Sequence, residues 1–264
     1  MNIQELFSLK GRVALVTGAT HGLGMAVATA LAEAGATLVV NGHSADRLEQ
    51  ALKAYREKGI DTKGYLFDVT DEQAVIEFVG RIEREVGPID ILVNNAGIIK
   101  RIPALDMTLP EWNEVITTDL TSPFLMSRVV AAGMIQRGGG KIINMCSMMS
   151  EVGRDSVTAY AAAKGGLKML TKNLATEWAK YNIQVNGIGP GYFATAQTAP
   201  IRQNGNPFNE FIISRTPASR WGDPKDLAGT AVFLASKASD FVNGHILYVD
   251  GGILASLGRA SNEN

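Results

Sequence analysis

Residues 13–24 read Val13-Ala14-Leu15-Val16-Thr17-Gly18-Ala19-Thr20-His21-Gly22-Leu23-Gly24, and this stretch decides the fold. Four apolar residues suited to a buried strand lead into closely spaced glycines, and an alanine-rich segment of helical length follows. Glycine lets the backbone turn tightly and approach a pyrophosphate, and the next helix directs its free N–H groups at the phosphate. The spacing differs from G-x-G-x-x-G, but the physical reasons are shared. The stretch predicts a strand, a phosphate-binding turn and a helix; a purely structural turn is the alternative.

Further apolar runs follow along the chain and alternate with segments of helical length. The runs lie at residues 37–40, 65–67, 89–93, 141–145, 184–188 and 246–249. Most are continuously apolar, which is typical of strands covered on both faces. Helices are expected over residues 44–58 and 71–85, with Ser44 and Asp71 as caps. The pattern predicts an α/β fold with a doubly wound parallel sheet of about seven strands flanked by helices, as a single domain over residues 1–264.

Polar or turn-forming residues follow most of these runs, at the points where the strands are expected to end. They include Thr17, Asn41, Asp68, Asn94, Ser147 and Pro190. Ligands of open α/β sheets bind at the carboxyl ends of the strands. The sequence therefore predicts one site at that edge of the sheet.

The composition argues against several classes of partner. A net charge of −1 gives no electrostatic reason to expect nucleic acid or an anionic membrane surface. Residues 13–32 lack charged side chains, but their glycines, threonines and histidine favour a buried strand, turn and helix over a membrane span. Cys146 has no second cysteine with which to form a disulfide, and the N-terminus shows no secretory signal pattern. We expect a cytoplasmic protein and assign no metal ligands.

The stretch from Pro190 to Pro224 interrupts the alternation of strands and helices. It carries Gly205-Asn206-Pro207 and scattered aromatic residues. Insertions before a final strand often form a mobile cover over a site. We expect a lid over about residues 192–223, and the alternative is a surface excursion without that role.

The end of the second run bears on the choice of cofactor, because Asn41-Gly42-His43 contains no acidic side chain. An acidic residue there binds the adenosine ribose hydroxyls and repels a 2′-phosphate. His21 and His43 are placed to face that phosphate, with Arg47 nearby, so we expect NADP, with NAD as a possible second cofactor. The alternative is that both histidines are solvated loop residues. Asp68, after the third run, is expected to accept from the adenine amino group.

Tyr160 and Lys164 are four residues apart, so on a helix they lie on one face. A free tyrosine has a pKa of about 10, and proton exchange at neutral pH needs a nearby cation that favours the phenolate. Lys164 supplies an ammonium, and Tyr160 then acts as general acid in reduction and general base in oxidation. Ser147 is expected to hydrogen-bond the same substrate oxygen. A lone Tyr-x-x-x-Lys is usually a surface pair, but the serine and the glycine turn together favour catalysis.

Taken together, these motifs resemble the short-chain dehydrogenase/reductase family over about residues 8–255. The matching positions are residues 17–24, Asp68, residues 94–97, Ser147, Tyr160, Lys164, Pro190, Gly191 and Thr195. The resemblance implies a Rossmann-type sheet of seven parallel strands and usually a homotetramer. It also implies that Lys164 binds the nicotinamide ribose and that residues 188–195 border the nicotinamide.

The residues expected to contact the cofactor lie in the glycine turn, after the strands and on the catalytic helix. They are Gly18, Thr20, His21, Gly22, Leu23, Gly24, His43, Ser44, Asp68, Val69, Asn95, Ala96, Gly97, Tyr160, Lys164, Pro190, Gly191, Phe193 and Thr195.

One position departs from the family. Asp119 stands where the family commonly has an asparagine that feeds a water chain to the catalytic lysine. An ionised carboxylate accepts from the same water but cannot donate. We interpret Asp119 as a modified member of that relay; strengthening of the charge of Lys164 and attraction of a cation are the two alternatives.

Three local strings are more specific than the family motifs. Residues 144–154, 215–222 and 241–245 resemble the corresponding stretches of gluconate 5-dehydrogenases. That resemblance implies reversible oxidation of D-gluconate to 5-dehydro-D-gluconate with NADP.

A sugar acid needs a cation for its carboxylate, and an arginine can bind a carboxylate through two parallel hydrogen bonds. Arg154 is the first candidate and Arg101 the second, with exposed cations or structural ion pairs as the alternative reading. Glu151 binds either a substrate hydroxyl or Arg154. Met149 is expected in the substrate pocket wall or the core. With Ser147 and Tyr160, these residues make up the expected substrate site.

Two other functions remain open at this point. The chain could be a related reductase for another sugar acid, a polyol or a 3-oxoacyl thioester. It could also be a non-catalytic dinucleotide-binding regulator, although Ser147, Tyr160 and Lys164 are all present.

Overall fold

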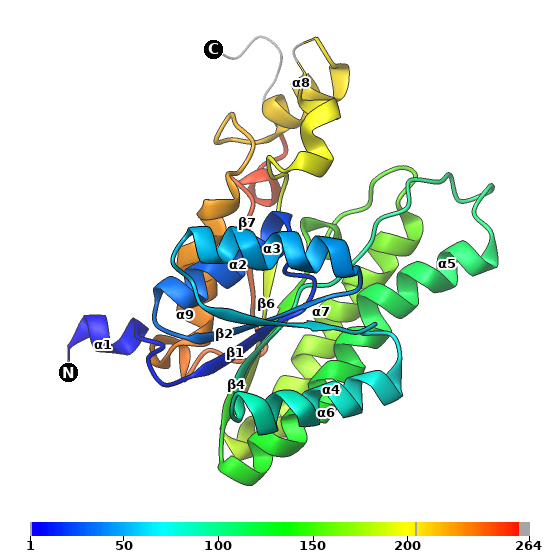
Figure 1. Cartoon of the computed structure of the whole chain (residues 1–264). Coiled ribbons are helices and arrows are strands. Elements are labelled where there is room, and N and C mark those ends of the chain that lie inside the picture. The colour runs from blue at the N-terminus through cyan, green and yellow to red at the C-terminus, as the bar shows by residue number, and fades with distance from the viewer. Residues whose placement is uncertain (1, 204, 259–264) are drawn as a thin grey trace.

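The computed structural model describes residues 2–203 and 205–258 and contains one seven-stranded parallel sheet in the order β3-β2-β1-β4-β5-β6-β7 (Figure 1). The strands are β1 (Val13–Val16), β2 (Thr37–Gly42), β3 (Thr62–Leu66), β4 (Ile89–Asn94), β5 (Gly140–Met145), β6 (Ile183–Pro190) and β7 (Ile246–Val249). The first strand lies inside the sheet, where it pairs with β2 on one side and β4 on the other. The predicted single-domain, Rossmann-type fold is confirmed.

The strand predictions hold at six of the seven runs, and the third needs a correction. Residues 65–67 were expected to form that strand, but β3 covers Thr62–Leu66. Its residues pair with Leu38 to Gly42 of β2, and it forms one edge of the sheet. An edge strand is less covered than a central one, so backbone pairing rather than apolar side chains defines its start.

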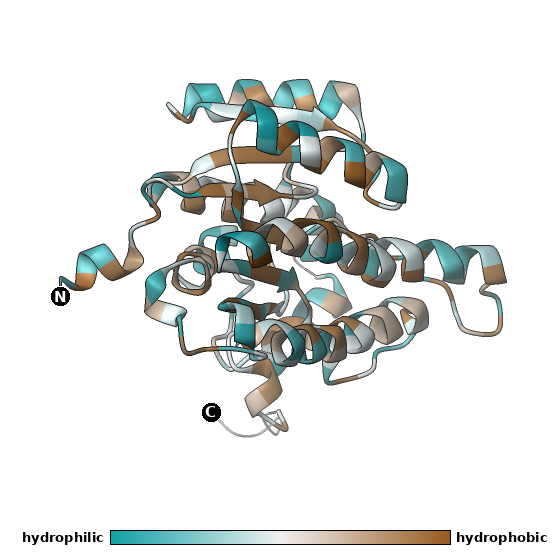
Figure 2. Cartoon of the chain, turned by 90° about the horizontal axis from the view of Figure 1, so that it is seen from below, coloured by the Kyte–Doolittle hydropathy of each residue, from teal (hydrophilic) through white to brown (hydrophobic). Residues whose placement is uncertain are grey.

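Helices cover both faces of the sheet (Figure 1). One face carries α2 (Gly22–Glu33), α3 (Ala45–Glu57) and α9 (Ala228–Ala235); the other carries α4 (Glu72–Glu85), α6 (Ser122–Arg137) and α7 (Thr158–Trp178). In β1, Ala14 and Val16 pack toward the first set and Val13 and Leu15 toward the second. The strands in Figure 2 are accordingly mostly hydrophobic, and the helices place hydrophilic residues outward. This double cover explains the continuously apolar runs.

Local signals fix the helix ends. Asp71 caps α4 by accepting from the backbone N–H groups of Gln73 and Ala74. Ser44 precedes α3 as expected, but its side chain makes no capping hydrogen bond. Gly35 and Gly59 follow α2 and α3 with φ of 103° and 73°, the conformation that favours glycine after a helix.

The remaining elements are shorter. They are α1 (Ile3–Phe7), α5 (Leu109–Ile116), α8 (Pro207–Arg215), a π-helical turn η1 (Thr117–Thr121), and the 3-10 turns η2 (Met148–Ser150), η3 (Ala179–Tyr181), η4 (Ala196–Arg202), η5 (Pro224–Leu227), η6 (Lys237–Ser239) and η7 (Ile253–Ala255). Within the described part of the chain, no helix combines the length and apolar character that crossing a membrane requires.

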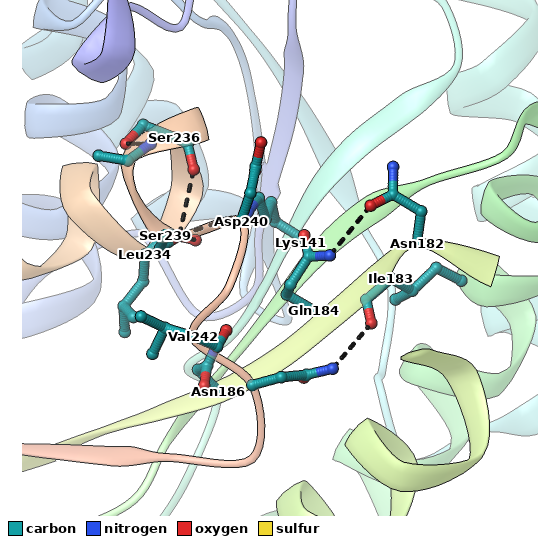
Figure 3. A network of polar contacts seen from close by, with 12 residues as sticks. Lys141, Asn182, Ile183, Gln184, Asn186, Leu234, Ser236, Ser239, Asp240 and Val242 are labelled. Carbon is teal, nitrogen blue, oxygen red and sulfur yellow. Dashed lines mark hydrogen bonds and ion pairs between the residues drawn. The ribbon is translucent and has the colours of Figure 1, made fainter. Parts of the chain in front are cut away.

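A buried lysine joins the last part of the chain to the sheet, at the end opposite to Ser147. Lys141 is the second residue of β5, and its Nζ lies 2.8 Å from Asp240 Oδ1 and 3.3 Å from Ser239 Oγ (Figure 3). Burial lowers the pKa of Lys141, and the bond to Asp240 opposes that effect. The contact attaches η6 to the amino-terminal ends of the strands, away from Ser147, which follows β5 at its other end.

Candidate active site

The glycine turn after β1 is held by Asn95, the residue that follows the neighbouring strand β4. Asn95 Nδ2 donates to the carbonyl oxygens of Thr17 and Gly18, both at 3.0 Å. Gly18 has a φ of +61°, and a Cβ there would lie 2.8 Å from the Cα of Ala96. A Cβ at Gly24 would lie 2.6 Å from the carbonyl oxygen of Gly18. Both glycines are required because backbone and amide atoms occupy the space that a side chain would need.

The same turn leaves room on its other side. A Cβ at Gly22 would meet no atom within 4 Å. His21, which precedes α2, gives the helix no capping hydrogen bond through its side chain. The N–H groups of the first turn of α2 therefore suit an anionic ligand, as a dinucleotide pyrophosphate requires.

Thr17 explains why the polar stretch after β4 lies against this turn. Its Oγ1 accepts from the N–H groups of Asn95 and Ala96 at 3.0 and 3.1 Å. Asn94 turns away and donates to Asn144 Oδ1 at 2.8 Å in the buried interior. These residues thus support the site from within, a role that their position in the sequence did not reveal.

Basic side chains gather beside the glycine turn at the end of β2. His21 is exposed, and its Nδ1 lies 3.0 Å from Thr20 Oγ1. Partial burial lowers the pKa of His21, and the nearby charges of Arg47 and His43 add to the effect. Asn41 points inward instead and donates to the carbonyl oxygen of Phe67 at 2.9 Å. The three basic residues therefore lie together, in keeping with a site for an additional phosphate.

The other expected cofactor residues surround these groups. Asp68 is exposed and accepts on Oδ1 from the N–H of Thr70, whereas Val69 is buried in the core below. Gly97 is exposed, Leu23, Ser44, Ala96 and Gly191 are half-buried, and Pro190 is the last residue of β6. The ring of Phe193 is buried and packs on Gly222, so a cofactor contact from this residue would use its backbone. Their contacts with a cofactor stay predictions.

Lys164 is the charged centre of the site. Its Nζ donates to the carbonyl oxygen of Met145 at 2.9 Å and lies 3.1 Å from Asp119 Oδ2. Burial is the largest effect on Lys164 and by itself would lower its pKa, but attraction to Asp119, with smaller contributions from Tyr160 and Cys146, raises the pKa above its ordinary value. The ammonium also lies 5.5 Å from the centroid of the Tyr160 ring, one helical turn earlier on α7. The lysine is thus held charged beside the tyrosine.

Asp119 lies in the π-helical turn between α5 and α6 and is fully buried. Its Oδ1 accepts from the N–H of Ile98 at 2.7 Å, and a Cβ at Gly97 would lie 2.9 Å from Oδ2. Oδ2 accepts no hydrogen bond of good geometry within the described residues, so its contact with Lys164 is an ion pair. The carboxylate reaches the lysine directly, whereas the sequence suggested a link through water.

Ser147 follows β5 and begins the turn η2. Its Oγ accepts from the N–H of Met149 at 3.1 Å. Ser150 connects this turn to α7, because its Oγ donates to the carbonyl oxygen of Lys164 at 2.9 Å. Met149 is buried with Met148, and Tyr160 packs against that cluster. The structure therefore brings the serine turn, the tyrosine and the lysine to the carboxyl edge of the sheet.

The two candidate carboxylate partners differ in environment. Arg154 is half-buried, and its Nη1 donates to Tyr192 Oη at 3.3 Å. Arg101 is exposed. The sequence allowed an ion pair between Glu151 and Arg154, but the structure does not contain it. Both carboxylate oxygens of Glu151 lie 2.6 Å from Lys168 Nζ instead.

Residues 192–223, where a lid was expected, leave the sheet and return to the same point. The N–H of Ala194 donates to the carbonyl oxygen of Gly222 at 2.8 Å, and the N–H of Gly222 donates to that of Tyr192 at 2.9 Å. Thr195 begins the turn η4 directly after this junction. The excursion is therefore closed at its base; its movement over the site stays a prediction.

Within residues 2–203 and 205–258, no three His, Cys, Asp or Glu side chains group in a way that would hold a metal ion.

Comparison with known proteins identifies close relatives. A family model described as enoyl-(acyl carrier protein) reductase matches residues 18–254. The chain is 65% identical to the 2-dehydro-3-deoxy-D-gluconate 5-dehydrogenase of Formosa agariphila, over 98% of each chain. It is 48% identical to the 5-keto-D-gluconate 5-reductase of Escherichia coli K12, over 97% of this chain and 100% of that one.

A solved structure shows the same architecture. The gluconate 5-dehydrogenase from Burkholderia cenocepacia, in complex with NADP and tartrate, is 42% identical and has a TM-score of 0.92 over 97% of this chain and 100% of that chain. The match of the family model over most of the chain, the end-to-end relatives and the shared fold together show that the chain belongs to the short-chain dehydrogenase/reductase family of oxidoreductases.

Proposed function

We propose that this protein is an NADP-dependent oxidoreductase that interconverts a hydroxyl and a carbonyl at carbon 5 of a six-carbon sugar acid. The observation that carries the proposal is the buried ion pair between Lys164 and Asp119, with the lysine ammonium 5.5 Å from the ring centroid of Tyr160. An ammonium held charged beside a tyrosine stabilises the negative charge that develops on the tyrosine oxygen as the proton leaves, as a general acid and base requires.

Each residue of the site then has a separate task. Tyr160 donates the proton to the substrate oxygen during reduction and accepts it during oxidation. Ser147 hydrogen-bonds the same oxygen and orients it. Asp119 keeps Lys164 charged. The nicotinamide, when bound, supplies or accepts the hydride, and the glycine turn and α2 hold the pyrophosphate that positions it.

The proposed choice of NADP rests on the basic group formed by His21, His43 and Arg47. No acidic side chain lies at Asn41, Gly42 or His43 to repel a 2′-phosphate. The Burkholderia cenocepacia relative binds NADP, which supports the same choice. NAD remains the second possibility, because histidines carry only a partial charge at neutral pH.

The first substrate pair is D-gluconate and 5-dehydro-D-gluconate, which the local sequence strings imply and the name of the Escherichia coli relative supports. The second candidate is 2-dehydro-3-deoxy-D-gluconate, oxidised at the same carbon. The 65% identity to the Formosa agariphila enzyme favours it. Both are six-carbon acids that react at carbon 5, so they require the same catalytic arrangement and differ near carbons 2 and 3.

The carboxylate of either substrate needs a cationic partner. Arg154 is the first candidate because it is half-buried and lies seven residues after Ser147. Arg101 is exposed and is the second candidate. Met149 lies in the wall between the serine turn and Tyr160.

The experiment follows the absorbance of reduced nicotinamide with purified protein. D-gluconate and 2-dehydro-3-deoxy-D-gluconate are each offered with NADP and NAD, and 5-dehydro-D-gluconate with the reduced cofactors. NADP-linked turnover of either acid supports the proposal, and the ratio of their kcat/KM values chooses between them. A 3-oxoacyl thioester and a neutral polyol serve as controls. Exclusive activity on either control refutes the sugar-acid assignment, and cofactor binding without turnover of any compound favours the regulator.

The homotetramer and the cytoplasmic location implied earlier stay predictions. Light scattering coupled to size-exclusion chromatography tests the first, and cell fractionation tests the second.

A further inference from the structure

Arg154 links the turn that carries Ser147 to the excursion of residues 192–223. Its Nη1 donates to Tyr192 Oη at 3.3 Å, and its Cζ lies 5.0 Å from the centroid of the Phe208 ring. Tyr192 follows β6, and Phe208 lies on α8, which stands at the end of the molecule to which β6 leads (Figure 1). A side chain of the serine segment is therefore already in contact with the expected lid.

The aromatic partners of Arg154 form a cluster of their own. Tyr192 meets Phe208 and Trp221 edge-on, with ring centroids 5.9 and 5.6 Å away. Trp221 Nε1 donates to Asn209 Oδ1 on α8 at 2.7 Å. We call Tyr192, Phe208 and Trp221 the aromatic latch. The aromatic latch joins both ends of the excursion to α8, since Tyr192 and Trp221 lie near those ends and Phe208 lies on the helix. A movement of the Tyr192 ring is therefore transmitted to α8 through packed rings.

The guanidinium of Arg154 has spare donors. It carries five N–H groups, and among the described residues its only hydrogen bond goes to the neutral hydroxyl of Tyr192. No carboxylate in the described part of the chain lies within 4 Å of it, whereas Lys100 and Lys168 are paired with Glu114 and Glu151. A half-buried cation supported by an aromatic ring and lacking an anion suits an external carboxylate.

This cation also lies close to the chemistry. Met148, Met149 and Ile253 form a buried cluster, and both Tyr192 and Tyr160 pack against that cluster. The cluster therefore extends from the proton-donating tyrosine to the aromatic latch without a break. Arg154 donates to Tyr192, so the guanidinium and Tyr160 are linked through one packed cluster.

We propose that Arg154, backed by Phe208 and oriented by Tyr192, is the subsite that selects a carboxylate on the substrate, and that filling it closes the excursion through the aromatic latch. The inference rests on the proposed sugar-acid function. The carboxylate takes two of the spare guanidinium donors, while Tyr192 and Phe208 fix the plane of the guanidinium. A neutral polyol leaves the cation unpaired and the latch unengaged.

The test uses the full-length enzyme and a matched pair of substrates. D-gluconate carries a carboxylate where D-glucitol carries a hydroxymethyl group, and the remaining hydroxyls are the same. Arg154→Lys keeps the charge but loses the planar donor pair, and Tyr192→Phe removes only the hydroxyl. Arg81→Lys, at an arginine of α4 that pairs with Glu85, is the matched control. We expect Arg154→Lys to lower kcat/KM for D-gluconate by about 10- to 100-fold, mainly through KM, with D-glucitol oxidation changed less than about twofold. Tyr192→Phe should show a smaller loss of the same kind.

A binding measurement separates this inference from the proposed function. Tyr160→Phe, loaded with NADP, allows calorimetry of D-gluconate binding without turnover, and the same measurement is made with Arg154→Lys added. The intrinsic fluorescence of Trp221, read as the difference from Trp221→Phe, should change with D-gluconate and stay constant with D-glucitol. Carboxylate-dependent binding that needs Arg154 supports the subsite even if none of the sugar acids is turned over.

Two results overturn the inference while leaving the proposed function intact. In the first, Arg154→Lys and Tyr192→Phe match the wild-type enzyme with D-gluconate. In the second, Arg154→Lys weakens D-gluconate and D-glucitol equally, which identifies a structural role. Thermal melting of each variant confirms that the fold is retained.

Discussion

Replacing Asp119 by alanine leaves the buried ammonium of Lys164 without its ion-pair partner. The two groups lie 3.1 Å apart with side chains 0% and 6% exposed, so solvent screens them little. Coulomb's law at that distance and an effective dielectric constant of about 20 gives an attraction of about 5 kcal/mol. Removing one member of a buried pair typically costs about 3–5 kcal/mol, because the other charge remains without a partner. We expect a loss of that size in the free energy of unfolding.

Thermal melting at neutral pH measures this loss. In a chain of this size, about 1 kcal/mol shifts the midpoint by roughly 2–4 °C, so Asp119→Ala should melt at least about 6 °C lower. The contribution of Lys164, whose pKa is raised in the folded protein, is fully present below the unfolded lysine pKa of about 10.4 and is lost as the pH rises through the higher folded value. In Asp119→Ala the unpaired Lys164 loses its proton at a lower pH than in the wild type. The difference in the free energy of unfolding between the two proteins should therefore narrow toward pH of about 10.

The double variant Asp119→Ala/Lys164→Met provides the control, because it removes both charges together. It should be clearly more stable than the sum of the two single losses predicts. The alkaline limb of the pH–rate profile of Asp119→Ala should also move to lower pH. The reasoning is wrong if the single losses add within about 0.5 kcal/mol, or if Asp119→Ala keeps both the melting midpoint and the pH–rate profile of the wild type.

Three further results are expected. Gly24→Ala should lose NADP binding, measured by fluorescence titration, because its Cβ would press against the turn and Asn95; retained affinity would show that the turn can relax. Burial raises the pKa of Cys146 to about 11, so an alkylating reagent at neutral pH should label it only after unfolding; rapid labelling of the folded protein would contradict its burial. The pKa of His21 is lowered, mainly by burial, so uptake of a proton on binding a 2′-phosphate should strengthen NADP binding as the pH falls from about 8 to about 6.5. NAD affinity should stay flat, and His21→Gln should reduce the pH dependence of NADP binding, with His43 accounting for the remainder; equal slopes for both cofactors would remove His21 from the phosphate site.

The sequence predicted the sheet well because its signal is local. Strands covered on both faces read as apolar runs, and β1 begins and ends at the expected residues. The third strand was displaced because Tyr65 is the one buried residue of β3, so pairing with β2 rather than an apolar run sets its bounds. The cap at Asp71 formed as expected, whereas Ser44 held its position without the hydrogen bond, since a capping residue type does not fix its rotamer.

Within the site, the sequence predicted which residues come together better than it predicted their hydrogen-bond and ion-pair partners. The sequence brought Tyr160 and Lys164 to one helical face, since four residues on a helix fix their relation. It did not predict that Asn95 would hold the glycine turn, because the two segments are 77 residues apart. It also left open the partner of Glu151, which proved to be Lys168 after the chain folded back on itself.

The π-helical turn at Asp119 had no sequence signal either. Apolar periodicity reports a regular helix, and a single widened turn leaves that periodicity almost unchanged. The departure from the family's usual asparagine was visible, but the direct ion pair with Lys164 depends on where that turn places the carboxylate. An irregular backbone turn of this kind leaves no pattern in the sequence and is seen only in the folded structure.

We propose that Tyr160 moves the proton in an NADP-linked reaction of a sugar acid. The most direct test measures oxidation of NADPH with saturating 5-dehydro-D-gluconate or the 5-keto form of 2-dehydro-3-deoxy-D-gluconate, in the wild type and in Tyr160→Phe. Turnover should fall by about 10²–10⁴-fold in the variant, while the Kd for NADPH changes less than about threefold. A variant that keeps wild-type turnover with either acid would contradict the account.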